Sequence, residues 1–233
     1  MNIANNLRNV VYQHWTAYSI SIIMPSDKRW IHERRHEMYY RQAKIDGYSS
    51  RAAYKIKQID DKHGIFGESG WVLDLCSAPG SWTQYIHDKH PTIDGIIGVD
   101  LQAVRPISNR VFFLKKDIMD ADFIDAVCKA AGKTAPFISV VLSDCAQKFT
   151  GARSVDLFRQ HELSMRVVDI CRQLLLPGGN CIVKSFQGLP EESKELEGGL
   201  KALFADVFKT KPDSSQKGSP EFYFIGKNKN KTT

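Results

Sequence analysis

The amino-acid sequence predicts an α/β fold in which one open, mostly parallel sheet is covered by helices on both faces. Short apolar runs alternate with stretches of helical periodicity along most of the chain, which is typical of such sheets. The 233 residues are enough to bury one sizeable core. With 42% hydrophobic and 25% charged residues, the composition excludes a disordered chain and a fibre.

Seven short apolar runs bounded by turn residues predict seven strands. They lie at residues 71–75, 96–101, 111–114, 137–142, 181–183, 207–211 and 222–226. Only about ten residues separate the last two runs, fewer than a parallel crossover usually needs. The last strand is therefore predicted to be antiparallel.

The intervening segments have the periodicity of helices. They lie at residues 34–58 with an interruption near Gly47, 81–90, 121–131, 161–176 and 194–206. One face of the segment 161–176 is apolar, with Leu163, Val167, Ile170, Cys171, Leu174 and Leu175. Pro177 and the two glycines after it are expected to end that helix.

Three segments are expected along the chain. Residues 24–228 are predicted to form a single domain, and residues 229–233 a basic tail. Residues 1–23 contain one charged residue, Arg8, and differ sharply in composition from the residues after Met24. We expect them to be an extension outside the fold, such as an upstream start codon would add.

Positive charge gathers at the two ends of the chain. The net charge is +6 with a pI near 9.0, and residues 24–59 hold +5 and residues 209–231 hold +4, which leaves −3 for the rest. Such ends favour an anionic partner such as RNA. The alternative is that they are solvated ends that keep the protein soluble.

The cysteine pattern predicts neither disulfides nor a structural metal. The five cysteines are Cys76, Cys128, Cys145, Cys171 and Cys181. None forms a CxxC pair, and no histidine completes a zinc pattern. We expect reduced thiols in a cytoplasmic protein. No apolar run approaches the ~18 residues that cross a bilayer, so no membrane is expected as a partner.

Five polar residues directly follow or end apolar runs: Asp74, Asp100, Asp117, Asp144 and Lys184. In an open α/β sheet, ligands bind outside the carboxyl ends of the strands. Each residue taken singly is also compatible with an ordinary strand end. Together they indicate one line of chemistry along one edge of the sheet.

The segment DLCSAPGSW, residues 74–82, reads as a strand-to-helix turn that cradles a small ligand. Of the glycines in GxGxxG only Gly80 is present, which disfavours a dinucleotide pyrophosphate. The turn suits a nucleoside with an uncharged linkage. Asp100, at the end of the next strand, can accept both ribose hydroxyls.

Further motifs occur in a fixed order between Lys28 and Gly226. They are YYRQAKIDGYSSRAAYKIKQID, DLCSAPGSW, GVDLQAVRPI, KKDI, VVLSDCA, LLLPGGNCIVKSFQG and KPDSS. In sequence and spacing they resemble the FtsJ/RrmJ (RlmE) family of S-adenosylmethionine (SAM)-dependent RNA ribose 2′-O-methyltransferases. The form of the basic segment looks closest to archaeal members.

The resemblance implies a Rossmann-like methyltransferase sheet that binds SAM, releases S-adenosylhomocysteine (SAH) and needs no metal. It implies that the turn with Gly80 and Trp82 approaches the methionine part of the cofactor, Asp100 the ribose, Asp117 the adenine amino group and Asp144 the reaction centre. The cofactor-binding residues expected in this way are Asp74, Ser77, Pro79, Gly80, Trp82, Asp100, Leu101, Asp117, Ile118 and Asp144.

The family's catalytic Lys-Asp-Lys-Glu tetrad matches Lys55, Asp144, Lys184 and Glu221. A 2′-hydroxyl is a poor nucleophile, so an enzyme must align it with the methyl group and take its proton. Lys184 is expected to be the general base and Asp144 to orient it, while Glu221 pairs with one lysine. Without the family, the less favoured alternative for Lys55 and Glu221 is a surface ion pair.

RNA is expected to enter along the basic ends. The candidate phosphate contacts are Lys28, Arg29, Arg34, Arg35, Arg41, Lys44 and Arg51. Interleaved aromatic residues that stack on bases or pack in the core are Trp30, Tyr39, Tyr40, Tyr48 and Tyr54. Lys211 and Lys217 flank Glu221, so the two ends are predicted to meet at the active site.

The sequence departs from the family's pattern in the two loops expected at the cofactor. Cys76-Ser-Ala-Pro-Gly-Ser stands where many members have Gly-Ala-Ala-Pro-Gly-Gly, and Cys145-Ala-Gln-Lys where many have Met-Ala-Pro-Asn. Gln216 and Ser49 each replace a common arginine. No tetrad residue is lost, so these departures bear on the choice of RNA rather than on the reaction.

The resemblance therefore implies a monomeric enzyme that transfers methyl groups from SAM to a ribose 2′-hydroxyl of structured RNA. A uridine of large-subunit (23S) ribosomal RNA is the expected target. The turn DLCSAPGSW also resembles the eukaryotic branch that modifies tRNA anticodon loops, which is the first alternative. A non-catalytic RNA-binding assembly factor is the second, and a small-molecule methyltransferase, disfavoured by the basic ends, is the third.

Overall fold

The computed structural model describes residues 28–231 except 106, 149, 189 and 217, with side chains from residue 37 onward. The described residues divide into two units, with the boundary between Met38 and Tyr39. The predicted extension 1–23 lies outside the described residues. The sheet and the polar residues predicted at its carboxyl edge belong to the second unit.

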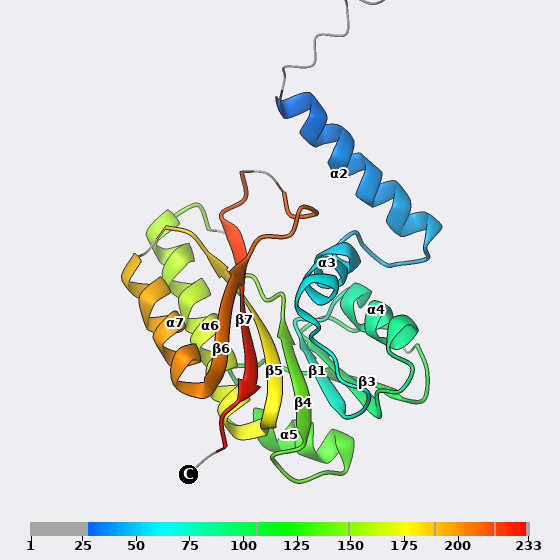
Figure 1. The fold of residues 1–233 in the computed structure, drawn as a ribbon, viewed down its shortest axis with the longest axis vertical. Coiled ribbons are helices and arrows are strands. Elements are labelled where there is room, and N and C mark those ends of the chain that lie inside the picture. The colour runs from blue at the N-terminus through cyan, green and yellow to red at the C-terminus, as the bar shows by residue number, and fades with distance from the viewer. Residues whose placement is uncertain (1–27, 106, 149, 189, 217, 232–233) are drawn as a thin grey trace, which may run out of the picture. The chain divides into compact units, whose positions relative to one another are not determined.

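Seven strands form one sheet, in the order β3-β2-β1-β4-β5-β7-β6 (Figure 1). Their bounds are β1 Trp71–Leu75, β2 Gly95–Asp100, β3 Val111–Lys115, β4 Ile138–Ser143, β5 Leu175–Phe186, β6 Phe204–Thr210 and β7 Glu221–Lys229. The first five run parallel to one another, and β7 runs antiparallel between β5 and β6. The mostly parallel sheet with an antiparallel last strand is confirmed.

Helices pack on both faces of the sheet, as predicted. These helices are α3 Ala53–His63, α4 Ser81–Lys89, α5 Phe123–Ala131, α6 Arg153–Leu174 and α7 Pro190–Leu203. A further helix, α2 Lys28–Ile45, precedes them in the chain and crosses the boundary between the two units. Side chains of α5, α6 and α7 share one core cluster, and those of α3 and α4 share the other. Among the described helices, none combines the length and the apolar character needed to cross a bilayer.

The two core clusters follow the alternation of the strands. In β1, Leu73 and Leu75 belong to the cluster of α5 to α7, whereas Val72 belongs to the cluster of α3 and α4. Successive side chains of a strand point to opposite faces. A sheet covered on both faces must therefore be apolar at consecutive positions, which is the pattern seen in the sequence.

The helix predicted at 161–176 begins earlier and ends earlier. Asp156, in the first turn of α6, accepts hydrogen bonds from the Thr150 amide and hydroxyl and from the Gly151 amide, which fastens the preceding loop to the helix start. The helix ends at Leu174 and β5 begins at the next residue. Pro177 and its glycines lie inside β5, not before it.

The Pro-Gly-Gly segment forms an irregularity in the ladder between β4 and β5. Ile138 pairs with Leu175 and Val140 with Asn180, so the segment 176–179 bulges out opposite a single residue. Proline lacks an amide donor and Gly178 has a φ of +79°, so neither fits a regular ladder. The residues that were expected to separate helix and strand are absorbed as a bulge.

Lys229, predicted as the start of a basic tail, is the buried last residue of β7. Its Nζ donates to the carbonyl oxygens of Cys171 at 3.0 Å, Arg172 at 2.9 Å and Leu175 at 2.7 Å. These carbonyls lie at the end of α6, where the helix dipole favours a cation. The lysine thus ties β7 to the end of that helix.

Candidate active site

The structure gathers the predicted polar residues along the carboxyl edge of the sheet. Asp100 ends β2, Asp117 follows β3 and Asp144 follows β4. Lys184 lies near the end of β5. Asp74 differs, because it lies within β1 with a side chain that is 1% exposed. Its Oδ2 accepts a hydrogen bond of 2.6 Å from the hydroxyl of Thr83 on α4.

The turn after β1 is fastened to β2. The amide of Ser77 donates to the carbonyl of Val99 at 3.0 Å, and the amide of Ala78 donates to Oδ2 of Asp100 at 2.9 Å. The Ala78–Pro79 peptide bond is cis, and Gly80 has a φ of +104°, a region that favours glycine. The turn is therefore held with its backbone against the end of the neighbouring strand.

Two features leave room for recognition at this end of the sheet. The hydroxyl oxygen of Ser77 is buried without a hydrogen-bond partner among the residues that the structure describes. Leu101, directly after Asp100, is 62% exposed. A buried orphan hydroxyl and an exposed apolar side chain are both unfavourable in water alone, and a bound molecule would satisfy them.

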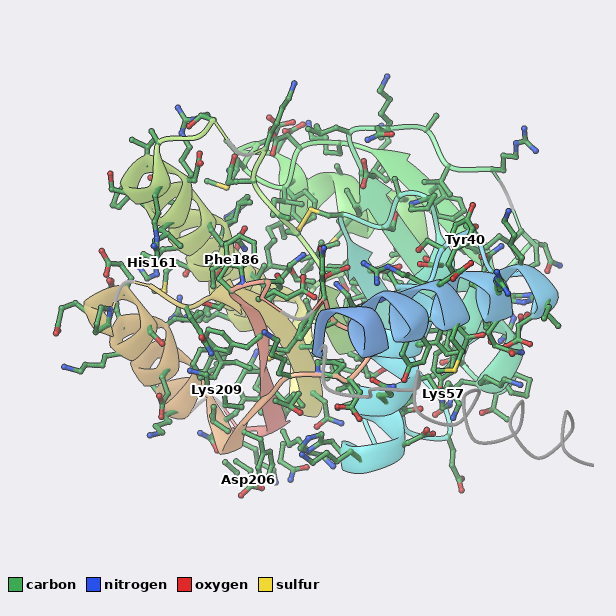
Figure 2. All side chains as sticks on the ribbon, turned by 90° about the horizontal axis from the view of Figure 1, so that it is seen from above. Tyr40, Lys57, His161, Phe186, Asp206 and Lys209 are labelled. Atoms are coloured by element: carbon green, nitrogen blue, oxygen red, sulfur yellow. A yellow bond between two sulfur atoms is a disulfide. The ribbon has the colours of Figure 1, made fainter. Side chains whose placement is uncertain are left out.

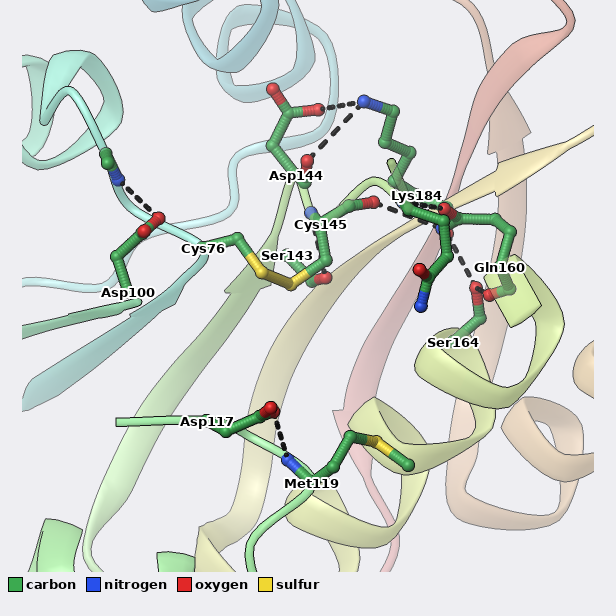
Figure 3. Close-up of a disulfide and its surroundings, with 12 residues drawn as sticks. Cys76, Asp100, Asp117, Met119, Ser143, Asp144, Cys145, Gln160, Ser164 and Lys184 are labelled. Atoms are coloured by element: carbon green, nitrogen blue, oxygen red, sulfur yellow. Dashed lines mark hydrogen bonds and ion pairs between the residues drawn. A yellow bond between two sulfur atoms is a disulfide. The ribbon is translucent and has the colours of Figure 1, made fainter. Parts of the chain in front are cut away.

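Other residues expected to bind the cofactor are buried or already hydrogen-bonded within the protein. Trp82 is buried, and its Nε1 donates to the carbonyl of Ala52 at 2.8 Å. Ile118 is buried too, with its carbonyl accepting from Arg166 Nε at 2.8 Å. The Oδ1 atom of Asp117 accepts from the amide of Met119 at 2.9 Å (Figure 3).

The four tetrad residues meet, although they come from distant parts of the chain. Lys184 Nζ lies 3.1 Å from Asp144 Oδ1 and 3.5 Å from Glu221 Oε2. Lys55 Nζ, from α3, lies 2.9 Å from Glu221 Oε1 and 3.7 Å from Asp144 Oδ1. Two ammonium groups and two carboxylates thus alternate in a closed ring at the edge of the sheet.

Tyr223 is a fifth member of this ring that the sequence reasoning missed. Its hydroxyl donates to Asp144 Oδ1 at 2.6 Å and accepts from Lys55 Nζ at 3.1 Å. The signal was present, because residues two apart on a strand share a face and Tyr223 is two residues after Glu221.

The ring sets the charge of its carboxylates. Burial alone would raise the pKa of Asp144, but Lys55 and Lys184, together with hydrogen bonds from Tyr223 and Lys184, lower it below the ordinary value. Burial opposes the same two ammonium groups at Glu221, whose pKa is also lowered. Burial, then the charges of Asp144 and Glu221, raise the pKa of the Tyr223 hydroxyl well above its usual range.

The cysteines at the edge overturn the expectation of five reduced thiols. Cys76, in the turn after β1, and Cys145, directly after Asp144, form a disulfide (Figure 3). Cys128, Cys171 and Cys181 are free. The sequence could not predict this bond, because 69 residues separate the pair and no spacing motif marks it. Among the described residues there is no cluster of three or more His, Cys, Asp or Glu side chains suited to a metal.

The basic segment before the site has both packed and exposed rings. Tyr54 is buried against Tyr39 at 5.3 Å and Tyr48 at 6.2 Å between ring centroids. Tyr40, labelled in Figure 2, is 52% exposed, with Lys44 Nζ 4.6 Å from its ring centroid. Of the predicted contacts, the side chains of Trp30 and of the cations between 28 and 35 lie outside the described residues.

The two basic segments meet beside the tetrad. Gln58, one turn after Lys55 on α3, accepts hydrogen bonds from the amide and hydroxyl of Ser214, each at 3.1 Å. Lys62 and Lys211 line a cavity of about 260 Å³ there. Lys217 lies outside the described residues.

The fold is an open α/β sheet of the class that binds ligands at the carboxyl ends of its strands, and a buried ring of lysines and carboxylates lies at that edge. A sequence profile of the FtsJ-like methyltransferase family matches residues 48–229, which span the turn, the strand-end acids and the whole ring. The chain belongs to this family, and it is a methyltransferase.

Individual relatives agree with the family assignment. The chain is 38% identical over 202 residues to "Ribosomal RNA large subunit methyltransferase E" of Methanosphaera stadtmanae, covering 85% of this chain and 96% of the relative. It is 32% identical over 205 residues to the protein of the same name from Legionella pneumophila, covering 88% and 97%.

Solved structures give the same answer at the level of the fold. A ribosomal RNA methyltransferase from Plasmodium falciparum is similar with a TM-score of 0.69 and 30% identity, over 79% of this chain and 100% of that one. Human methyltransferase-like protein 13, crystallised with SAH, shares the fold with a TM-score of 0.54 and 16% identity, over 75% and 81% of the two chains.

Proposed function

We propose that the protein transfers a methyl group from SAM to the 2′-hydroxyl of a ribose in large-subunit ribosomal RNA, with a uridine as the target. The observation that carries this proposal is the ring of Lys55, Asp144, Lys184 and Glu221 at the carboxyl edge. The names of relatives from archaea and bacteria favour ribosomal RNA over the anticodon loop of tRNA.

The residues after β1 and β2 fit SAM. Asp100 offers a carboxylate for the ribose hydroxyls, and Ser77 offers the buried hydroxyl that lacks a partner among the described residues. Leu101 offers an exposed apolar surface for the adenine, and Gly80 brings backbone close to the methionine part. When bound, SAM supplies an electrophilic methyl group on a positively charged sulfur.

The ring of lysines and carboxylates is proposed to position and deprotonate the ribose 2′-hydroxyl. Lys184 is proposed to take the proton of the 2′-hydroxyl after its own ammonium group has released a proton to solvent, with Asp144 and Glu221 fixing the position of its Nζ at 3.1 and 3.5 Å. Tyr223 holds Asp144 and Lys55 in place by its two hydrogen bonds. Holding the hydroxyl in line with the methyl group supplies part of the rate, since well-oriented reactants gain roughly 7–11 kcal/mol.

The basic segments are proposed to hold the RNA. Arg41 and Lys44 are exposed on the last turns of α2, and Lys62 and Lys211 line the cavity beside α3. Contacts of this kind neutralise phosphates and make binding sensitive to salt. The expectation of a monomeric, cytoplasmic enzyme with a fold boundary near residue 24 remains a prediction.

The test is to incubate the full chain with labelled SAM and with large ribosomal subunits, free ribosomal RNA or tRNA lacking 2′-O-methyl groups. We expect label on the ribose of a single uridine in large-subunit RNA, mapped by nuclease digestion and mass spectrometry. Label confined to a tRNA anticodon loop would move the function to the alternative substrate. SAM binding without label in any RNA would overturn the proposal.

A further inference from the structure

The disulfide between Cys76 and Cys145 joins the ends of two neighbouring strands. Leu75 and Ser143 are paired residues of β1 and β4, and each cysteine lies within two residues of its strand's end, with 5.0 Å between the two Cα atoms. Figure 3 shows the sulfur atoms between Asp100 and Asp117 on one side and Asp144 and Lys184 on the other. The bond therefore lies at the centre of the carboxyl edge.

The same place is where the order of the sheet reverses. From β1 the chain adds β2 and β3 on one side, then returns to add β4 and β5 on the other side. Open α/β sheets bind their ligands in the crevice at such a reversal. The disulfide spans this point of reversal, from the turn after β1 to the loop after β4.

Both anchors of the bond are coupled to groups that the proposed function uses. On one side, Cys76 precedes the two amides of Ser77 and Ala78 that are tied to β2 and Asp100. On the other, the carbonyl of Cys145 accepts from Gln160 Nε2 at 3.1 Å, and the same nitrogen reaches the carbonyl of Lys184 at 3.5 Å. A change in the distance between the two cysteines would therefore move both the turn bonded to Asp100 and the loop linked through Gln160 to Lys184.

The backbone conformation of Cys76 is a second, independent observation in favour of a role for this cysteine. Its φ of +58° is a left-handed conformation that side chains with a Cβ seldom adopt, and glycine is the usual residue there. A cysteine at this position costs backbone energy that glycine would not. It places a sulfur atom within bonding reach of Cys145.

We propose that Cys76 and Cys145 are a reversible redox modification site that controls cofactor binding. The oxidised pair ties the turn after β1 to the loop after β4 and weakens binding of SAM and SAH, whereas the reduced pair leaves the turn and the loop free to part around the cofactor. This inference rests on the proposed function, because it concerns regulation of the same site.

The chemistry balances with a small-molecule disulfide as oxidant and a dithiol as reductant. Cys76 is part-exposed and Cys145 is 1% exposed, so the oxidant meets Cys76 first. The Cys76 thiolate attacks the oxidant's S–S bond and releases one thiolate. The Cys145 thiolate then displaces the second from Cys76, and the two cysteine protons pass to the released thiolates. A dithiol reverses both steps and becomes a cyclic disulfide.

The test measures SAH binding to the full chain by calorimetry, after treatment with dithiothreitol and after treatment with oxidised glutathione, with bond formation followed by mass spectrometry. We expect the reduced protein to bind SAH ~10-fold more tightly or better, which is about 1.4 kcal/mol. Cys145→Ser should bind SAH equally under both conditions. The matched control is Cys128→Ser, a free cysteine on α5, which should keep the full redox response.

Two outcomes overturn the inference: no Cys76–Cys145 bond forms under oxidation, or SAH affinity is the same with and without it. RNA methylation by the same samples separates the two proposals. A redox-dependent SAH affinity in a protein that methylates no RNA would retain this inference and overturn the proposed function. Methylation of ribosomal RNA with no redox dependence of SAH binding would overturn the inference alone.

Discussion

Two buried aspartates on neighbouring strands have opposite electrostatic situations. Asp74 of β1 is buried with one hydroxyl partner, Thr83, and burial, together with the charges of Asp144 and Asp100, raises its pKa to about 7. Asp144, after β4, is buried as well, but Lys55 and Lys184 lower its pKa. Burial alone therefore does not decide the charge of a carboxylate, and the cations that the fold brings to it do.

The contrast extends to the two halves of the carboxyl edge. The half built on β1 to β3 relies on local turn geometry, with amides of the turn bonded to the adjacent strand. The half built on β4, β5, β7 and α3 relies on side chains that only the complete fold assembles. Substitutions in the first half should alter cofactor binding, and those in the second should alter turnover.

The largest effect is expected for Lys184→Ala. Removal of the proposed general base should lower kcat about 10²–10⁴-fold, while affinity for SAH and RNA remains near that of the wild type. Lys184→Arg should be equally inactive, because a guanidinium keeps its proton. Lys57→Ala is the matched control, since Lys57 (Figure 2) pairs with Asp61 on the exposed side of α3. If Lys184→Ala kept more than a tenth of the wild-type kcat, the assignment of turnover to the half built on β4, β5, β7 and α3 would be wrong.

Asp74→Asn tests whether the pKa of Asp74 is raised, in contrast to the lowered pKa of Asp144. In the wild type the raised pKa means that the folded state holds a proton that the unfolded state has lost. Stability is therefore fully present below the ordinary value of 3.8 and falls as the pH rises to about 7. The cumulative loss amounts to about 4 kcal/mol at most.

Asparagine removes this penalty, so the variant should gain stability over the wild type between pH 4 and 7. Urea unfolding at several pH values measures the difference. The carboxylates of the ring have the opposite sign, because lowered pKa values stabilise the fold above their ordinary range and lose that contribution as the pH falls through them. A constant difference between Asp74→Asn and the wild type across this range would refute the assignment of a raised pKa.

Asp100→Ala should affect binding without affecting turnover. Loss of hydrogen bonds to a charged group costs about 1.5–3 kcal/mol, so SAH affinity should fall roughly 10–100-fold. The value of kcat at saturating SAM should change little. Asp125→Ala, which removes an exposed carboxylate on α5, serves as the control. If kcat fell as strongly as affinity, the two halves would not be separable.

The smallest effect is expected for Tyr223→Phe. The ring loses two hydrogen bonds but keeps all four charges, so kcat should fall about 10-fold with SAH affinity unchanged. Tyr85→Phe is matched to it, because Tyr85 is also buried and its hydroxyl bonds to Asp60, outside the ring. Equal effects of the two substitutions would mean that Tyr223 contributes to packing only.

The sequence alone was enough to predict the strands, most of the helices and the acids at the carboxyl edge. These depend on periodicity and on the residues directly after each strand, such as Asp100 and Asp144, and both are local properties. Local reasoning was wrong at Pro177, where the breaker residues lie inside a strand as a bulge.

The tertiary structure decided the features that depend on partners far along the chain. The bond between Cys76 and Cys145, the place of Tyr223 in the ring and the burial of Lys229 against the end of α6 have no local signal of their own. The opposite charges favoured at Asp74 and Asp144 likewise depend on which side chains the fold brings near them. The periodicity that predicts helices and strands depends on residues adjacent in the sequence. Side-chain contacts and the charge states of buried carboxylates depend on residues that are adjacent only in the folded structure.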